Sequence, residues 1–251
     1  MRDLYTTLRK RMDKALFDFG MLAPGDRILV GVSGGADSLC LLQLLHDKFS
    51  TSGTSRLIAC HVDLGFEPPE TGAWKKLETY FQLLGVPYRI IHTCISSIAL
   101  APDAKKNPCF ICSHNRRRKI YEIAHAEGCK KIAYGHHKDD IIETLLINIL
   151  YGRRVEAMYP VQEVFKGKMA IVRPFTYVDE TMLKRFAEEQ GLPVLPRQCP
   201  VDRHSRRQTV KDLIQALQTR EPHANIRNNI FRSLHHVNLP DSFKPGMQPE
   251  K

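Results

Sequence analysis

The stretch Ser33–Ser38, with the sequence SGGADS, has the residue types and spacing of a phosphate-binding turn. It follows the short apolar run Ile28–Val32, which suits a buried parallel strand, and it precedes an apolar run typical of a helix. Gly34 and Gly35 allow unusual backbone angles and let a ligand approach the backbone, while the helix start directs unpaired N–H groups into the turn. The pattern is neither a Walker loop nor a Gly-x-Gly-x-x-Gly turn. It predicts a phosphate site, with an ordinary strand–helix turn as the alternative.

A second candidate site lies at Gly135–Thr144, with the sequence GHHKDDIIET, which again follows a predicted strand. Asp139 and Glu143 are four residues apart, so they share one face of the helix. His136 and His137 stand beside these carboxylates, although acidic residues at a helix start are also favoured by the helix dipole alone. A phosphate ligand is commonly bound together with Mg²⁺, which carboxylates and phosphate oxygens hold. The candidate magnesium ligands are Asp37 with Asp139 or Asp140.

Three cysteines form the third candidate site. Cys109 and Cys112 make a C-x-x-C at an expected loop-to-helix boundary, and Cys199 is the other cysteine in a polar, loop-like setting. Three thiolates on a four-iron cluster would leave one iron open, whereas zinc would need a fourth ligand such as His114 or His204. Unligated or redox-active thiols are a further alternative. The other cysteines suit small core positions: Cys40, Cys60, Cys94 and Cys129.

The charge balance indicates a polyanionic partner. The chain has 37 Lys+Arg and 27 Asp+Glu, a net charge of +10. Basic clusters flank the cysteines on both sides, where RNA phosphates would bind in a salt-dependent way, although a solvated surface would have the same composition. The candidate RNA-binding residues are Arg116, Arg117, Arg118, Lys119, Arg203, Arg206 and Arg207.

The elements expected around these residues alternate between strand and helix. This order predicts an α/β fold with a parallel sheet, in which ligands lie beyond the carboxyl ends of the strands. Strands are expected at 28–32, 56–63, 86–92, 131–134 and 169–174, a loop at 96–108, and helices at 4–19, 71–84, 120–128, 179–190, 209–219 and 224–236. Asp63 ends the second strand and either faces the nucleotide or caps the next turn. The candidate ATP-binding residues are Ser33, Gly34, Gly35, Asp37, Ser38, His61, Asp63, Gly135, His136, Asp140 and Arg173.

The length of 251 residues suits one α/β domain with an appendage. We expect an N-terminal helix in 1–24, the nucleotide-binding unit in 25–194, and a basic, cysteine-containing loop with helices in 195–251. The chain shows no apolar run of transmembrane length, no signal-peptide core and an odd number of cysteines, seven. These features predict a cytoplasmic protein without membrane attachment.

Taken together, the motifs resemble those of the tRNA 2-thiocytidine synthetases, which are N-type ATP pyrophosphatases of the PP-loop superfamily. The SGGxDS turn, the C-x-x-C followed by three arginines, GHHKDDIxxTL and Ile171–Phe175 occur in this order from about Leu8 to Asn238. The resemblance implies a Rossmann-like, adenine nucleotide alpha hydrolase-like domain with a helical C-terminal extension. It also implies that ATP and Mg²⁺ adenylate a cytidine carbonyl of tRNA. Sulfur from a cysteine desulfurase or free sulfide, carried on a 4Fe-4S cluster, would then displace AMP in a homodimeric enzyme.

In this interpretation Asp37, Asp139, Cys109, Cys112 and Cys199 are the catalytic residues. The chain departs from the family pattern at Ala36, where a lysine is usual, and at Cys199, where two close cysteines are common. A thiouridine-forming or lysidine-synthetase-like enzyme is therefore an alternative. A further alternative, from another class, is a non-catalytic RNA-binding protein that also binds a nucleotide and a cluster.

Overall fold

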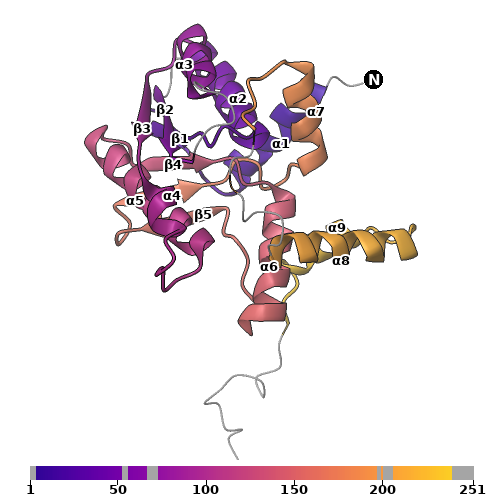
Figure 1. The fold of residues 1–251 in the computed structure, drawn as a ribbon. Helices are drawn as coiled ribbons and strands as arrows, with labels where there is room; N and C mark the ends of the chain where they lie inside the picture. Colours follow the sequence, from indigo (N-terminus) through magenta and orange to yellow (C-terminus); the bar gives the residue numbers. More distant parts are fainter. Residues whose placement is uncertain (1–3, 53–55, 67–72, 197–198, 200–205, 239–251) are drawn as a thin grey trace, which may run out of the picture.

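The computed structural model describes residues 4–52, 56–66, 73–196, 199 and 206–238, and its centre is a six-stranded sheet of order β3-β2-β1-β4-β6-β5 (Figure 1). The strands are β1 Arg27–Gly31, β2 Arg56–Asp63, β3 Tyr88–His92, β4 Lys131–Tyr134, β5 Val161–Val164 and β6 Met169–Val172. All neighbouring strands are parallel except the pair β5 and β6. The predicted parallel α/β fold is confirmed. Because β2 and β3 lie on one side of β1 and β4 on the other, the strand order reverses between β1 and β4.

Helices cover both faces of the sheet, as Figure 1 shows. One face carries α1 Leu4–Asp18, α2 Ala36–Ser52, α3 Ala73–Leu83 and α7 Glu180–Glu189, and the other carries α4 Ile95–Ala99 and α5 Pro108–Ala126. Successive residues of β1 point to opposite faces, so that Ile28 and Val30 pack in the first core, whereas Leu29 packs with Ile120 of α5. This two-sided burial explains why the strands read as continuous apolar runs.

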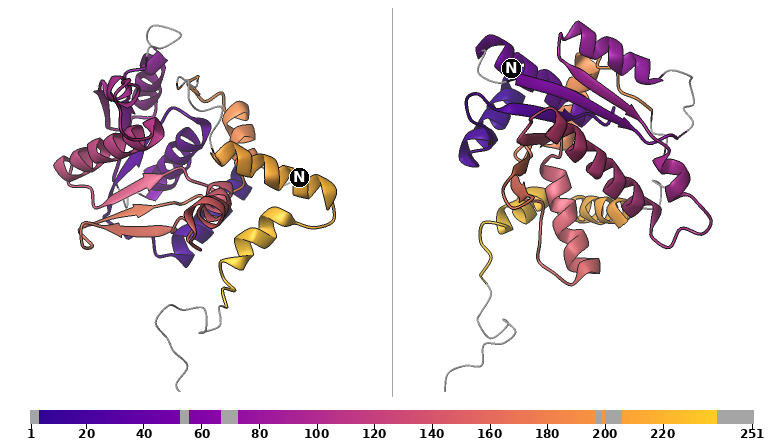
Figure 2. Two further views of the ribbon diagram at one scale, coloured as in Figure 1. Left: turned by 60° about the horizontal axis from the view of Figure 1, so that its bottom comes forward. Right: turned by 90° about the vertical axis from the view of Figure 1, so that its left-hand side faces the viewer.

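The C-terminal helices pack on α6 (Lys138–Gly152), which leaves the sheet edge (Figures 1 and 2). Ile141 and Ile142 of α6 form a separate apolar cluster with Val210 and Ile214 of α8 (Arg206–Arg220) and with Phe231 of α9 (Ile226–Ser233). The predicted helical C-terminal region is therefore present. The division at residues 24/25 and 194/195 remains a prediction.

Three local differences separate the expected elements from the observed ones. The four-residue strand β5 was not anticipated, and α4 occupies part of the expected loop 96–108. The C-x-x-C belongs to the first turn of α5, because Asn107 accepts a hydrogen bond from the Cys109 amide and Pro108 occupies the first helical position. None of the helices in the described ranges has the length and apolar character needed to cross a membrane.

Candidate active site

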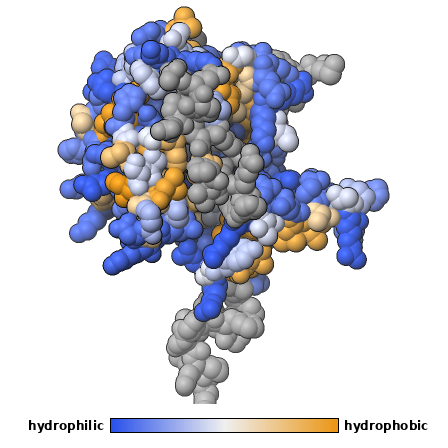
Figure 3. All heavy atoms as spheres, viewed as in Figure 1, coloured by the Kyte–Doolittle hydropathy of each residue, from blue (hydrophilic) through white to orange (hydrophobic). Residues whose placement is uncertain are grey.

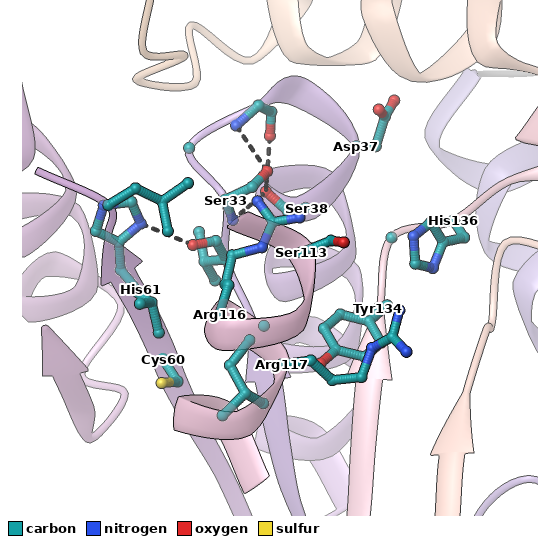
Figure 4. A pocket seen from close by; sticks show the side chains of 18 of the residues that line it. Ser33, Asp37, Ser38, Cys60, His61, Ser113, Arg116, Arg117, Tyr134 and His136 are labelled. Carbon is teal, nitrogen blue, oxygen red and sulfur yellow. Dashed lines mark hydrogen bonds between the residues drawn. The ribbon is translucent and has the colours of Figure 1, made fainter. Parts of the chain in front are cut away.

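A cleft of about 770 Å³ opens where the strand order reverses between β1 and β4. Parallel sheets bind ligands at this point because the loops after the two strands diverge to opposite faces. The cleft is lined by the Ser33–Ser38 turn after β1, by Gly135 and His136 after β4, and by α5 residues on one side (Figure 4). Its volume suits a nucleotide-sized ligand.

The Ser33–Ser38 turn is held by hydrogen bonds among its own hydroxyl and backbone groups. The Ser33 amide donates to Ser38 Oγ at 3.1 Å, the Gly35 amide donates to Ser33 Oγ at 3.2 Å, and Ser38 Oγ donates to the Gly35 carbonyl at 2.9 Å (Figure 4). Gly34 has a φ of 89°, which side chains disfavour. The two serines therefore shape a compact turn, and both of its glycines line the cleft.

The glycine after β4 allows the two turns to meet. A Cβ on Gly135 would lie 2.8 Å from both the carbonyl carbon and the oxygen of Asp37 and 2.9 Å from the Ser38 amide nitrogen. These neighbours are backbone atoms, so a side chain at Gly135 would push the start of α2 away. The Leu195 amide donates to the Gly34 carbonyl at 2.8 Å, which brings Leu195 against the turn.

His137 lies between the carboxylates of the two turns. Its Nε2 is 3.8 Å from Asp37 Oδ2 and 3.5 Å from Asp140 Oδ2. Its Nδ1 accepts the Asp140 amide at 3.4 Å, and its own amide donates to Asp140 Oδ2 at 3.1 Å, which forms a capping box at the start of α6. The cap fixes the ring so that Nε2 faces both carboxylates.

Burial dominates the electrostatics of the cleft. It raises the pKa of Asp37, only partly offset by His137. Burial would also raise the pKa of Asp140, but His137, His136 and Arg207 together lower it below its usual range. Burial lowers the pKa of His136 to about 4, so this imidazole is neutral at pH 7. His137 and Lys184 therefore compensate the burial of Asp37 less than His137, His136 and Arg207 compensate that of Asp140.

Three buried polar atoms at the cleft have no hydrogen-bond partner among the described residues: Asp37 Oδ1, His136 Nδ1 and Arg173 Nε. Buried polar groups are normally paired, and an unpaired one costs about 1–3 kcal/mol. A carboxylate oxygen without a donor suits a cation, and a guanidinium N–H without an acceptor suits an anion. This combination fits a metal-bound phosphate ligand.

The predicted residues His61, Asp63 and Arg173 all line the cleft. His61 Nδ1 lies 2.8 Å from the Val32 carbonyl and therefore carries the proton there. Asp63 lines the cleft, and its Oδ1 accepts the Gly65 amide at 2.9 Å, so it caps the following turn, while its contact with a nucleotide remains a prediction. Arg173 is 6% exposed and donates to the Tyr159 carbonyl and to Gln162 Oε1, so it is a fixed cation.

Asp139 and Glu143 share a helix face, as predicted, but that face points to the C-terminal helices and not to the cleft. Asp139 accepts Arg227 Nη1 and the Glu180 amide, both at 2.8 Å. Glu143 accepts Arg207 Nη1 at 2.9 Å. Of the two alternatives for magnesium, Asp140 lines the cleft with Asp37, whereas Asp139 lies outside it.

The predicted RNA-binding residues divide into distinct groups. Arg116 and Arg117 line the cleft (Figure 4), whereas Arg118 and Lys119 pair with Glu122 at 3.0 and 2.8 Å. Arg206 lies 4.9 Å from the centre of the Tyr151 ring, and Arg207 binds Asp140 and Glu143. Arg203 and His204 lie outside the described residues.

Cys199 is a wall residue of the cleft, and Cys112 lies near it. Burial first, and then the neighbouring Cys199 and Cys109 thiols, raise the pKa of Cys112. Cys109 and Cys112 belong to the first turn of α5, and neither lines the cleft, so the joint cluster site of the three cysteines remains a prediction. Cys40, Cys60 and Cys129 are buried, whereas Cys94 is exposed at the start of α4.

Sequence reasoning did not single out several cleft residues. Trp74, Ser113 and Tyr134 line the cleft, and so do Gln162 and Leu195. Trp74 is the one tryptophan of the chain, and this rarity is a weak sequence indication of a functional role. No sequence pattern marks the other four residues. Their positions follow from packing between elements that are distant in sequence.

The fold and the cleft are those of a nucleotide-binding α/β protein, and comparison with known proteins specifies the family. Residues 4–217 match the PP-loop domain family. The tRNA-cytidine(32) 2-sulfurtransferase of Nitrosospira multiformis is 35% identical over 241 residues, covering 93% of this chain and 78% of that protein. The protein of the same name from Alkalilimnicola ehrlichii is 35% identical over 267 residues, covering 97% and 82%.

The chain therefore belongs to the PP-loop family and, within it, to the family of the tRNA-cytidine(32) 2-sulfurtransferases. Among solved structures, it resembles the U34-tRNA thiolase NcsA from Methanococcus maripaludis, determined with its 4Fe-4S cluster. The likeness has a TM-score of 0.76 at 24% identity and covers 94% of this chain and 80% of that one. At this identity the likeness shows a shared fold.

Proposed function

We propose that this protein is an ATP-dependent, 4Fe-4S-dependent sulfurtransferase that converts cytidine 32 of tRNA to 2-thiocytidine. The relatives covering most of the chain are named for this reaction. The observation that carries the proposal is that Cys199 lines the same cleft as the Ser33–Ser38 turn. A nucleotide-activating site and a sulfur-handling site would then share one substrate.

ATP is proposed to bind with its phosphates against the Ser33–Ser38 turn, at the start of α2. Asp37 and Asp140 would hold Mg²⁺, and Asp37 Oδ1 supports this role because it has no hydrogen-bond donor among the described groups. A bound cation would also return the raised pKa of Asp37 towards its usual range. Asp139, which Arg227 and the Glu180 amide already hold, would position α6.

Cys109, Cys112 and Cys199 are proposed to hold the cluster. Within the described ranges, no three His, Cys, Asp or Glu side chains are close enough to bind one metal ion. The thiolates of a four-iron cluster bind separate irons, so they lie further apart than ligands of one zinc ion do. The solved thiolase that this chain resembles carries a 4Fe-4S cluster, which favours a cluster over zinc here. When bound, the cluster would supply an iron without a cysteine ligand, to which sulfide can attach.

The chain's own residues would work in two stages. In the first, the cytidine C2 oxygen attacks the α-phosphorus of ATP, pyrophosphate leaves, and the turn amides with Asp37 and Asp140 hold the phosphates and metal in line. In the second, sulfide attacks C2 and AMP leaves with the original oxygen. His136 is neutral at pH 7 because burial lowers its pKa to about 4, so it would accept or donate a hydrogen bond without adding charge.

The partners follow from this chemistry. Arg116 and Arg117 at the cleft would meet phosphates of the bound substrates, and Arg118 and Lys119 would meet the tRNA backbone nearby. Arg203 and Arg206 are further candidates for tRNA binding, whereas Arg207 is engaged with Asp140 and Glu143. A cysteine desulfurase or free sulfide would supply the sulfur. A homodimer in the cytoplasm completes the proposal.

The test is an anaerobic reaction of the iron- and sulfide-loaded protein with tRNA, ATP, Mg²⁺ and sulfide, followed by nucleoside mass spectrometry. We expect 2-thiocytidine and AMP from the unaltered protein. We expect Cys199→Ala to lose cluster and thiolation, while Cys94→Ala, another cysteine outside the core, retains both. Full thiolation by Cys199→Ala would contradict the cluster assignment. If an amine added to the reaction is joined to the tRNA cytidine in place of sulfur, the lysidine-type reaction is favoured. Binding of ATP and tRNA without turnover would favour a non-catalytic protein.

A further inference from the structure

An aromatic pair stands exposed at the start of α5, between and beside the cysteines. The rings of Phe110 and His114 are stacked, with centroids 5.8 Å apart and planes inclined by 12°. Phe110 is 51% exposed, and His114 is exposed as well. Neither residue belongs to a core cluster among the described residues, and neither lines the cleft.

Helix geometry places this pair at the rim of the cleft. Residues 110 and 114 are one turn apart on α5, so they share one helix face. Arg117, three residues after His114, lies on this same face, and it lines the cleft together with Ser113 and Arg116 on the adjoining face. A ligand that extends from the cleft across α5 therefore meets the aromatic pair next.

The charges around the pair favour a polyanion. Lys106 Nζ lies 5.1 Å from the centre of the Phe110 ring. Further along α5, Arg118 and Lys119 share one carboxylate, that of Glu122, so this region keeps a positive charge. Figure 3 shows hydrophobic side chains gathered among hydrophilic ones over α4 and α5. An exposed ring surrounded by cations suits an unpaired nucleotide, which offers a base to stack and a phosphate to bind.

We propose that Phe110 and His114 form a stacking platform for an unpaired base of the tRNA loop, adjacent to the cytidine in the cleft. The inference rests on the proposed function, because it takes the partner to be a tRNA loop. Stacking here would hold the loop open and direct the target cytidine towards the Ser33–Ser38 turn. Lys106 would bind the phosphate of the stacked nucleotide.

The test is the affinity of the cluster-loaded protein for an anticodon stem–loop RNA with cytidine at position 32. We expect Phe110→Ala to weaken binding by about 5- to 100-fold, the range for loss of one base–aromatic stack. Phe110→Trp should restore most of the affinity because it keeps an aromatic face. Phe17→Ala is the matched control, since Phe17 is 86% exposed on α1, and it should bind like the unaltered protein.

Two further measurements separate stacking from damage to the site. Iron and sulfide content and ATP affinity should be unchanged in Phe110→Ala, because the Phe110 ring is exposed, belongs to no core cluster of the described residues and does not line the cleft. Binding of a fully paired two-stranded RNA duplex should not respond to Phe110→Ala, because no unpaired base is present. If the unaltered protein binds the stem–loop and Phe110→Ala binds it equally well, the platform is contradicted and the proposed function stands. If the unaltered protein neither binds nor thiolates the RNA, both proposals fail.

Discussion

The two turns that meet at the cleft are similar in topology and opposite in chemistry. Each follows a parallel strand and opens a helix, at Ser33–Ser38 after β1 and at Gly135–Asp140 after β4. The first offers small hydroxyl groups and glycine backbone, apart from Asp37. The second offers buried ionisable side chains, whose pKa values depend on partners from α8. The first turn is thus a cradle defined by local sequence, and the second a charge network defined by tertiary structure.

The difference teaches where each kind of substitution should act. Changes in the glycine turn should affect how closely a phosphate approaches the backbone. Changes in the charged turn should alter metal binding, stability and their dependence on pH. Asp37 belongs to both descriptions, because its backbone contacts Gly135 and its carboxylate faces His137.

Asp37→Asn should have the largest effect, because it removes the one carboxylate of the first turn. Loss of a metal ligand at the reacting phosphates costs several kcal/mol of transition-state stabilisation, so we expect AMP formation to fall by about 100-fold or more. The iron and sulfide content should stay the same, because Asp37 is not one of the proposed cluster ligands. Turnover of ATP measured with labelled nucleotide checks this, and unchanged turnover would remove Asp37 from the site.

Gly135→Ala should force the two turns apart. The added Cβ would meet backbone atoms of Asp37 and Ser38 at 2.8–2.9 Å, so we expect a loss of about 1–3 kcal/mol in the free energy of unfolding, with weaker ATP binding. Gly35→Ala is the matched control, because its nearest contact would be Ser33 Oγ at 3.4 Å. Urea unfolding of both variants tests the difference. Equal stability would mean that the close approach is not required.

Arg207→Ala should destabilise the charged turn in a pH-dependent way. Burial already raises the pKa of Glu143, whose side chain is 1% exposed, and loss of Arg207 would raise it further. The folded variant then holds a proton that the unfolded chain releases above the usual value of 4.5, so its stability falls as pH rises past that value. The loss should be about 1–2 kcal/mol near pH 8, since Lys211 remains a partner, and smaller near pH 5.

The control for this variant is Arg206→Ala, which removes the neighbouring cation that stacks on Tyr151. Its effect should be under about 1 kcal/mol and nearly independent of pH. A pH-independent loss in Arg207→Ala would show that Arg207 acts through packing alone.

His136→Asn should act on the pH dependence of stability and have little effect at pH 7. The pKa of His136 is lowered from 6.5 to about 4 by burial, so between these values the unfolded chain binds a proton that the folded chain does not. The stability due to this neutral imidazole is present above about pH 6.5 and is lost as pH falls towards 4. The variant should therefore lose less stability on acidification. His125→Asn, on the exposed end of α5, should keep the original slope.

The sequence predicts the first turn better than the second for a physical reason. Strand, glycines and helix start are neighbours in the chain, so their pattern alone places Ser33–Ser38 in the cleft. Asp139 and Asp140 are also neighbours, but which one faces the cleft depends on Arg227 and Arg207 from the C-terminal helices. The four-residue spacing of Asp139 and Glu143 predicts that they share a helix face. The direction of that face depends on the packing of the C-terminal helices, which the sequence pattern does not reveal.

The same limit applies to the fold. The parallel strands are buried on both faces and appear as apolar runs, whereas β5 is a four-residue edge strand with the polar pair Gln162 and Glu163 at its centre. Its antiparallel pairing with β6 depends on the turn between them, which includes positive φ angles at Phe165 and Lys166. Neither residue type favours that conformation, so Gly167, with a φ of 80°, is the one turn signal in this segment.

The most direct test of the account is the ratio of AMP released to 2-thiocytidine formed in one anaerobic reaction of the cluster-loaded protein with tRNA. If the glycine turn and the cysteines serve one substrate in one cleft, the ratio is about one, and both products disappear together in Asp37→Asn. In Cys199→Ala, 2-thiocytidine should disappear while ATP binding remains. Thiolation without AMP, or AMP release indifferent to tRNA, would contradict the account.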